Sequence, residues 1–149
     1  MAVKIRTADP HDFLACVEVL PKKWRAATVE ARLGVQLYKD WVFVATDEKN
    51  TIVGFLACDA DFFDGDGFYL RTLVVIETYR RKGCGEALFQ YATKWAFARG
   101  ARRVFADVID GALGKVLVDK LGFEKVGEIN HMHSEDSNYV IYSRKNPGN

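Results

Sequence analysis

Residues 80–85, Arg-Arg-Lys-Gly-Cys-Gly, place three cations and two glycines directly before an apolar helical pattern. Glycine adopts backbone angles closed to other residues and lets a ligand approach the main chain. The first turn of a helix also offers unpaired N–H groups and the positive end of the helix dipole. This junction therefore predicts a phosphate-binding cradle, in which Arg80, Arg81 and Lys82 add positive charge. A tight structural turn would explain the same residues.

Two familiar phosphate motifs do not fit the junction. A dinucleotide fingerprint needs a small residue at the position of Leu88, and a P-loop needs Gly-Lys-Ser/Thr, which the chain lacks. Twenty-one Lys and Arg against twenty Asp and Glu give a net charge of +1, so no global field attracts nucleic acid or an anionic membrane. The cradle is expected to serve another small polyanion, although a nucleotide stays open as an alternative.

The patterns around this junction predict a mixed α/β fold. Alternating and β-branched runs separated by turn residues predict three antiparallel strands in series before the junction. A continuous apolar face predicts a helix directly after it. A further strand and helix imply a crossover, so we expect a mostly antiparallel sheet with a central parallel pair and helices on both faces. The expected strands are 3–6, 41–46, 51–57, 68–76, 104–109, 123–132 and 139–144, and the expected helices are 9–20, 28–38, 84–98 and 113–121.

Length and composition favour a single domain over residues 1–149. The chain is 49% hydrophobic and 28% charged, as in ordinary globular proteins. Its cysteines, Cys16, Cys58 and Cys84, are too few for a disulfide framework and lack metal-ligand spacing; Cys84 begins the apolar helix face and is interpreted as a packing residue. No apolar run reaches the roughly 18 residues of a membrane span, and no signal-peptide pattern is present. We therefore expect a cytoplasmic protein with no membrane partner.

The junction resembles the cofactor motif of the GCN5-related N-acetyltransferase (GNAT) superfamily. That motif is Gln or Arg, two residues of any type, Gly, one residue of any type, then Gly or Ala, and it stands here as residues 80–85. Tyr79 and a strand end with Leu73 and Val75 precede it, as the family usually shows. The tripeptide Leu-Gly-Phe at 121–123 lies at about the family's separation. The resemblance spans most of the chain.

The resemblance implies an acetyl-coenzyme A-dependent N-acetyltransferase. Backbone N–H groups from Arg81 to Glu86 would hold the pyrophosphate, and the strand end would pair with the pantetheine arm, with an N–H near Val75 facing the thioester oxygen. The strand at 104–109 would splay away to open a slot. A primary amine, on a small molecule or a peptide, would attack the thioester directly in a ternary complex. The cofactor-binding residues so implied are Leu73, Val74, Val75, Arg80, Arg81, Lys82, Gly83, Cys84, Gly85 and Glu86, with no metal.

The chain departs from the family at its usual general acid. Val118 stands where many members have a tyrosine, Asp110-Gly111 replaces an asparagine that commonly opens the same helix, and Glu77 takes a place where proline is common. A thiol has a pKa of about 8.5 and leaves tolerably without help, while a positioned donor contributes about 10²–10⁴-fold. We therefore expect slower transfer; an acyl-coenzyme A-binding module with weak or no catalysis is the alternative.

Asp107 and Tyr142 are the candidate catalytic residues. Asp107 interrupts the apolar strand at 104–109, where a carboxylate is costly unless it is paired or used, and it lies within one residue of a catalytic glutamate of some family members. It would take the proton from the amine, or it lies at the open end of the strand and accepts hydrogen bonds from the next loop. Tyr142, or Tyr139, on the last strand would protonate the thiolate, unless these side chains pack or face water.

Three further features are weaker. His131 and His133 lie on one face of a predicted strand, but no third metal ligand is evident and a polar strand edge is the simpler interpretation. Residues 22–25, Lys-Lys-Trp-Arg, lie where the resemblance places the helix pair that shapes the acceptor site; an acidic acceptor is one interpretation, and a solvated loop is the simpler one. Tyr69 and Arg71 alternate on the predicted strand at 68–76 and are further candidates to face the acceptor slot. The identity of the amine stays open, as does the oligomeric state, although homodimers are common in the family.

Overall fold

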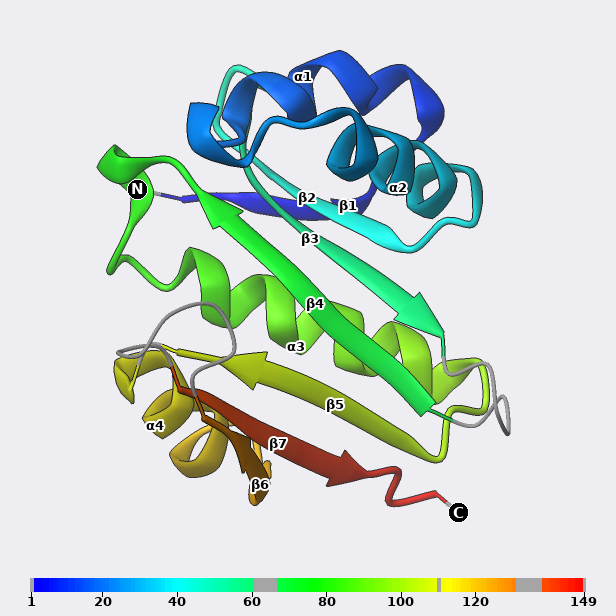
Figure 1. Ribbon diagram of the computed structural model, residues 1–149, viewed down its shortest axis with the longest axis vertical. Coiled ribbons are helices and arrows are strands. Elements are labelled where there is room, and N and C mark those ends of the chain that lie inside the picture. Colours follow the sequence, from blue (N-terminus) through cyan, green and yellow to red (C-terminus); the bar gives the residue numbers. More distant parts are fainter. Residues whose placement is uncertain (1, 61–66, 110, 131–137, 149) are drawn as a thin grey trace.

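A seven-stranded sheet runs through the computed structural model, which describes residues 2–60, 67–109, 111–130 and 138–148 (Figure 1). Its strands are β1 (Lys4–Thr7), β2 (Val42–Thr46), β3 (Ile52–Ala60), β4 (Gly67–Val75), β5 (Arg103–Val108), β6 (Glu124–Ile129) and β7 (Tyr139–Lys145). The order across the sheet is β1-β2-β3-β4-β5-β7-β6. Neighbouring strands are antiparallel except β4 and β5, which are parallel. This is the mixed sheet that the sequence predicts.

Helices cover both faces of the sheet, as expected. They are α1 (Phe13–Val19), α2 (Ala27–Tyr38), α3 (Cys84–Ala98) and α4 (Gly111–Asp119), with short 3-10 turns η1 (Pro10–Asp12), η2 (Lys22–Trp24) and η3 (Glu77–Tyr79). Side chains alternate along each strand, so Phe43 and Leu56 join the core under α3 and α4 while Val44 and Phe55 join the core under α1 and α2. Figure 1 shows α1 and α2 at the β1–β3 end of the sheet and α4 at the β5–β7 end.

Helix α3 follows the parallel strand β4 and supplies most of one core. Its buried side chains are Cys84, Leu88, Phe89, Ala92, Thr93 and Ala96, which recur at helical spacing along one face. Gly83 before the helix and Gly100 after it have positive φ values of 83° and 90°, a conformation that glycine adopts without strain. The sequence therefore specifies both the buried face of α3 and its two ends.

The last two strands form the predicted antiparallel pair, but β7 lies between β5 and β6. The register runs from Arg103↔Lys145 to Val108↔Val140 on one side of β7 and from Glu124↔Ser143 to Ile129↔Tyr139 on the other. The C-terminal strand is therefore inserted into the sheet, and β6 forms its edge. The sequences Asp-Gly-Asp-Gly at 64–67 and Ser-Glu-Asp at 134–136 are typical of turns; they lie outside the described residues except for Gly67, which begins β4.

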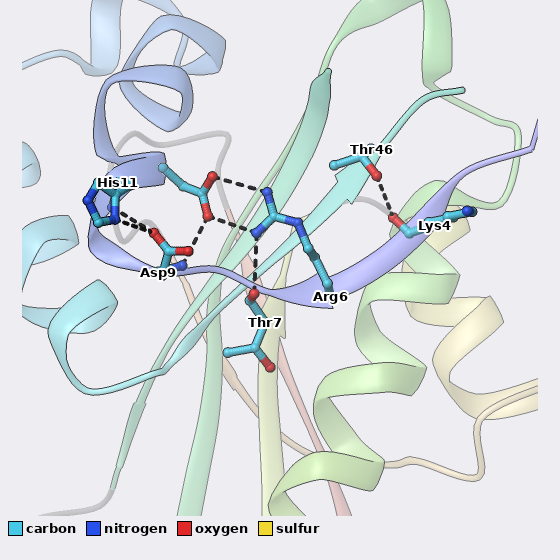
Figure 2. A network of polar contacts seen from close by, with 7 residues as sticks. Lys4, Arg6, Thr7, Asp9, His11 and Thr46 are labelled. Atoms are coloured by element: carbon cyan, nitrogen blue, oxygen red, sulfur yellow. Dashed lines mark hydrogen bonds and ion pairs between the residues drawn. The ribbon is translucent and has the colours of Figure 1, made fainter. Parts of the chain in front are cut away.

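A polar network ties β1 to the start of the first helical segment (Figure 2). The guanidinium of Arg6 donates to both carboxylate oxygens of Asp12, at 2.8 and 3.1 Å. The same carboxylate accepts from the backbone N–H of Asp9 at 3.0 Å, and Asp9 accepts from the N–H of His11 at 2.8 Å. The hydrogen bond from Arg6 lowers the pKa of Asp12 below its ordinary value. The network fixes the turn by which the chain leaves β1.

Candidate functional site

The candidate site opens where β4 and β5 separate. Their parallel register runs from Gly67↔Arg103 to Leu70↔Ala106, and in the described part of the chain they form no pair beyond it. Strand β4 continues to Val75 paired with β3 alone, and the two strands diverge from their common end in Figure 1. One edge of β4 after Leu70 therefore faces a fork, and its backbone groups are available to a ligand. The resemblance implied this separation.

Beside the fork, α3 presents its N-terminus. Arg81 and Gly83 have positive φ values of 61° and 83°, and the N–H of Ala87 bonds to the carbonyl of Gly83 at 3.0 Å. Because this bond closes the first helical turn, the N–H groups at 84–86 have no partner within the helix. Together with the helix dipole, they form a site that attracts anions.

Gly85 allows α3 to start close against β4. A Cβ atom at this position would lie 3.1 Å from the Cδ2 atom of Leu73, a separation tighter than ordinary van der Waals contact. At Gly83 a Cβ atom would meet nothing within 4 Å, so there the need for glycine comes from the positive φ. The two glycines of the motif therefore have different roles: Gly83 permits the conformation of the loop, and Gly85 permits the close spacing between α3 and β4.

A pocket of about 660 Å³ joins the free end of β4 to this helix N-terminus. Its walls contain every predicted cofactor-binding residue except Lys82, whose Nζ atom donates to the carbonyl of Thr78 at 2.7 Å. The full lining is Pro21, Trp24, Leu73, Val74, Val75, Tyr79, Arg80, Arg81, Gly83, Cys84, Gly85, Glu86, Ala112, Leu113, Val116 and Lys120.

The α4 side of this pocket could not be foreseen from residue types. Ala112, Leu113 and Val116 carry no chemical signature of their own, because the apolar spacing of α4 predicts only that one face packs. Lys120 follows α4 and pairs with Glu86 at 3.7 Å, which joins the end of α4 to the first turn of α3. Trp24 falls within the basic segment 22–25, and 44% of its surface is exposed.

Side-chain cations surround the mouth of the pocket. The Nε atom of Arg80 donates to the carbonyl of Val75 at 2.9 Å, which ties the loop to the end of β4. Arg80, Arg81 and Lys120 line the pocket together with the acidic Glu86. The local balance is therefore positive in a chain whose net charge is only +1, and the combination suits a polyanion.

Asp107 lies on β5 directly after the last residue that pairs with β4. Its strand neighbours Ala106 and Val108 point into the core under α3 and α4, so its side chain faces the other side of the sheet. Burial raises the pKa of Asp107 above its ordinary value, and the nearby charge of Arg71 opposes that rise. A half-buried carboxylate with a raised pKa at the fork is suited to accept a proton.

Tyr142 lies on the opposite face from Asp107. It pairs with Ala106, and its ring contacts Gly114 of α4 so closely that a Cβ atom there would overlap its hydroxyl. Tyr139 is the tyrosine associated with Asp107, since burial, and after it the charge of Asp107, raises the pKa of Tyr139. Val118 is 44% exposed and is absent from the pocket lining. The structure thus places Asp107 at the fork and Tyr142 one strand away on the opposite face, and neither residue is in the lining of the pocket.

The three cysteines are buried and free. Burial raises the pKa of the Cys84 thiol to about 11 and that of Cys16 to about 12, and it holds the pKa of Cys58 well above its ordinary value. A thiol with such a pKa is protonated near neutrality and is a poor nucleophile. Cys84 therefore lines the pocket as a packing residue.

Neither a metal site nor a membrane span is found in the described ranges. In that part of the chain, no group of three or more His, Cys, Asp and Glu side chains could hold a metal ion. His131 and His133 lie outside it. None of the helices that the structure describes is long and apolar enough to cross a membrane.

A forked mixed sheet whose fork meets a helix N-terminus suited to anions is the arrangement that the resemblance to the GNAT superfamily implies. The model of the acetyltransferase (GNAT) family matches residues 11–123. The match covers more than half of the chain, from η1 to the start of the last hairpin, and the chain belongs to this family.

Solved structures with the same fold cover nearly the whole chain. A mosquito arylalkylamine N-acetyltransferase-like protein 5b superposes with a TM-score of 0.81 at 14% identity, covering 97% of this chain and 100% of the other. The NatC complex bound to Gag peptide and coenzyme A gives 0.79 at 15% identity, covering 97% and 99%. A GNAT-family acetyltransferase from Bacillus cereus gives 0.78 at 20% identity, covering 97% and 98%. At these identities the likeness concerns the fold.

A curated relative matches over a shorter stretch. The uncharacterized N-acetyltransferase YobR of Bacillus subtilis is 38% identical over 60 residues, which are 40% of this chain. The matched stretch spans about a quarter of that relative, 24% of its length.

Proposed function

We propose that this protein is an acetyl-coenzyme A-dependent N-acetyltransferase that acetylates a primary amine by direct attack in a ternary complex. The observation that carries the proposal is the continuity between the fork after Leu70 and the α3 N-terminus, joined by one pocket in a chain of the GNAT family. A pocket that offers a free strand edge at one end and anion-binding N–H groups at the other suits a ligand with an amide-containing arm and a pyrophosphate.

The residues present fit coenzyme A. The edge of β4 at Leu73–Val75 offers backbone donors and acceptors to an extended arm, as an added strand would use them. The N–H groups at 84–86, with Arg80, Arg81 and Lys120, suit the phosphates. When bound, acetyl-coenzyme A supplies an activated acetyl group. The NatC neighbour was solved with coenzyme A, which supports the same ligand here.

Asp107 is the proposed base. An alkylamine is protonated near pH 7 and must lose that proton before it can attack a carbonyl carbon. Asp107 stands at the fork with a raised pKa caused by burial, so its carboxylate holds a proton better than an exposed aspartate does. The nearby cation Arg71 limits this rise, because it favours the ionised form of the carboxyl.

Tyr142 is the proposed acid for the departing thiolate. Its partner in the register, Ala106, is the last residue of β5 paired with β4, so Tyr142 lies one strand away from the fork. Its contact with Gly114 fixes the ring against α4. Val118 supplies no proton, and the role of the family's usual tyrosine passes to a residue of β7 in this proposal.

The alternative is an acyl-coenzyme A-binding module with weak or no catalysis. The exposed Val118 favours it, because the usual proton donor is missing while the pocket is retained. The remaining parts of the proposal are a cytoplasmic location, a small-molecule or peptide amine as acceptor, and self-association as a homodimer.

One experiment separates the two functions. Release of coenzyme A from acetyl-coenzyme A is measured across a panel of primary amines, while calorimetry measures the affinity for acetyl-coenzyme A itself. We expect binding together with amine-dependent release. Tight binding without any amine-dependent release identifies the binding module. Thermal stabilisation by ATP or NAD, but not by coenzyme A, overturns both and identifies a nucleotide-binding domain.

A further inference from the structure

A polar cluster lies beside the fork on the face of the sheet away from α3. The Nε atom of Arg71 is 2.9 Å from Oδ2 of Asp59, and these side chains are 40% and 17% exposed. The other carboxylate oxygen of Asp59 accepts from Nε2 of Gln36 at 3.2 Å, and Gln36 is buried on α2. Helix α2, β3 and β4 therefore hold the guanidinium in place.

An aromatic pair fixes the other side of the same guanidinium. Tyr69 and Phe105 are direct partners in the parallel register, and their rings stack with centroids 4.9 Å apart at 17°. The guanidinium carbon of Arg71 lies 5.0 Å from the centre of the Tyr69 ring, within cation–π distance. Arg71 is held by a carboxylate and a ring, and both contacts restrict its rotation.

The charges of the cluster do not cancel. Asp59, Arg71 and Asp107 carry two negative charges and one positive charge when Asp107 is ionised. Asp59 makes the direct ion pair with Arg71, and the nearby charge of Arg71 opposes the rise in the pKa of Asp107. The pKa of Tyr139 is raised by burial and by the charge of Asp107, so its hydroxyl stays neutral near pH 7. Among Asp59, Arg71 and Asp107, negative charge therefore exceeds positive charge when Asp107 is ionised.

We infer that this cluster favours, as acceptors, primary amines with no carboxylate on the amine-bearing carbon. The inference rests on the proposed function and names the substrate class of the same site. A carboxylate approaching Arg71 would compete with Asp59, which already neutralises the guanidinium and is also bonded to Gln36, and it would meet the charge of Asp107. An ammonium group with no neighbouring carboxylate is attracted by Asp59 and Asp107, and Asp59 partly offsets the repulsion from Arg71. Free α-amino acids are disfavoured relative to alkylamines and to amines next to an amide.

Matched acid and amide pairs isolate the charge. Phenylalanine, leucine and serine are each compared with their amides, which have nearly the same shape, and with the corresponding decarboxylated amines. Every kcat/KM is expressed per concentration of deprotonated amine, because an amide lowers the pKa of the neighbouring ammonium and only the free base attacks. We expect kcat/KM to favour the amide over the acid by about tenfold or more, or about 1.4 kcal/mol. Equal kcat/KM for acids and amides overturns the inference. Comparison of the amides with the decarboxylated amines separates a peptide-like acceptor from a small alkylamine.

Two variants should move this preference in opposite directions. Asp59→Asn removes the partner of Arg71, so the guanidinium becomes available and the acid is accepted about tenfold better relative to the amide. Arg71→Gln removes the cation, so the preference for the amide increases. Glu48→Gln, in the exposed β2–β3 turn at the other end of β3, makes the same charge change as Asp59→Asn and should leave the ratio unchanged. A ratio that stays at the wild-type value in both site variants overturns the inference.

Binding supplies a readout that does not depend on acetyl transfer. Calorimetry or ligand-observed NMR with phenylalaninamide and phenylalanine, at saturating coenzyme A, should show weaker binding of the acid in the wild type and a smaller difference in Asp59→Asn. If coenzyme A binds, no amine is acetylated and the amide still binds better, the proposed function fails and the charge selection stands. If amines are acetylated with no difference between acid and amide, the charge selection fails and the proposed function stands.

Discussion

Burial and the charge of Arg71 have opposite effects on the pKa of Asp107. Burial on β5 raises its pKa, and the charge of Arg71 across the fork opposes that rise. The same burial that costs free energy for the charged form makes the group a stronger base at neutral pH. The sequence shows an acidic residue within an apolar strand, which indicates burial. It does not show that Arg71 lies near this carboxylate.

Replacing Asp107 tests the proposed base. In the wild type, kcat/KM should rise with pH through the raised pKa of Asp107, because only the ionised form accepts a proton. In Asp107→Asn we expect this limb of the pH profile to disappear and kcat/KM at pH 7 to fall by about 10²–10⁴-fold, with unchanged calorimetric affinity for acetyl-coenzyme A. Asp107→Glu keeps a carboxylate and should keep the limb. A variant profile that matches the wild type removes Asp107 from the mechanism.

The residues around the candidate site were predictable to different degrees. The cradle could be predicted because glycine and clustered cations are distinctive residue types next to a clear helix pattern. Asp59 and Gln36 could not, since a polar residue near the end of a strand or on a helix gives no sign of its partner 23 positions away. For Tyr142, the sequence predicts only a position on the last strand. Its contact with α4 follows from the place of β7 between β5 and β6.

At the scale of elements, the handover from β4 to α3 depends on two glycines with different tasks. Gly83 supplies a positive φ, and Gly85 lets the helix approach Leu73. Gly100, at the other end of α3, also has a positive φ and open space where a Cβ would be. Gly100 therefore serves as a matched control for Gly83, because a substitution at either position strains the backbone in the same way.

Gly83→Ala and Gly100→Ala should cost similar stability but differ in ligand binding. Each places an alanine in the left-handed region, which costs about 1–2 kcal/mol, so both should lower the midpoint of urea denaturation. Only Gly83→Ala alters the loop that leads into the N–H groups at 84–86, and it should weaken acetyl-coenzyme A binding by tenfold or more in calorimetry. Equal affinities in the two variants would contradict the cradle.

The helices and strands can be predicted closely from the sequence, but the order of the strands across the sheet cannot. Period-2 runs and the apolar face of α3 predict strands and helices within a few residues of those observed, including the parallel pair. The insertion of β7 between β5 and β6 is set by which strand edges remain unpaired after the crossover. That is a property of the assembled sheet, and no local pattern in residues 123–145 records it.

For the molecule as a whole, the bond between Arg6 and Asp12 holds the first strand to the helical layer (Figure 2). Asp12 has a pKa below its ordinary value because Arg6 donates to it. A carboxyl whose pKa is lower in the folded state contributes stability above its unfolded pKa, and this stability is lost as the pH falls through the folded pKa.

Asp12→Asn should therefore lower the free energy of unfolding at pH 7 by about 1 kcal/mol, because Arg6 is 39% exposed and solvent weakens the pair. Urea denaturation at pH 7 and below pH 4 should show this difference shrinking with acid. Glu128→Gln removes the partner of Lys125 at 2.8 Å, where both side chains are about half exposed, and should leave the free energy of unfolding nearly unchanged. A difference for Asp12→Asn that is constant with pH would contradict the assigned role of Asp12.

The short parallel register between β4 and β5 has a mechanical consequence. Four residue pairs, Gly67↔Arg103 to Leu70↔Ala106, join the half-sheet β1–β4 to the half-sheet β5–β7–β6 through their backbones; this paired segment is called the seam below. Helix α3 packs across it. One half-sheet carries the strand edge at Leu73–Val75 and the other carries Asp107 and Tyr142. The distance between a ligand on that edge and its proposed base is therefore set by the angle at the seam. Substitutions at the seam can misalign the reaction while leaving every ligand contact intact.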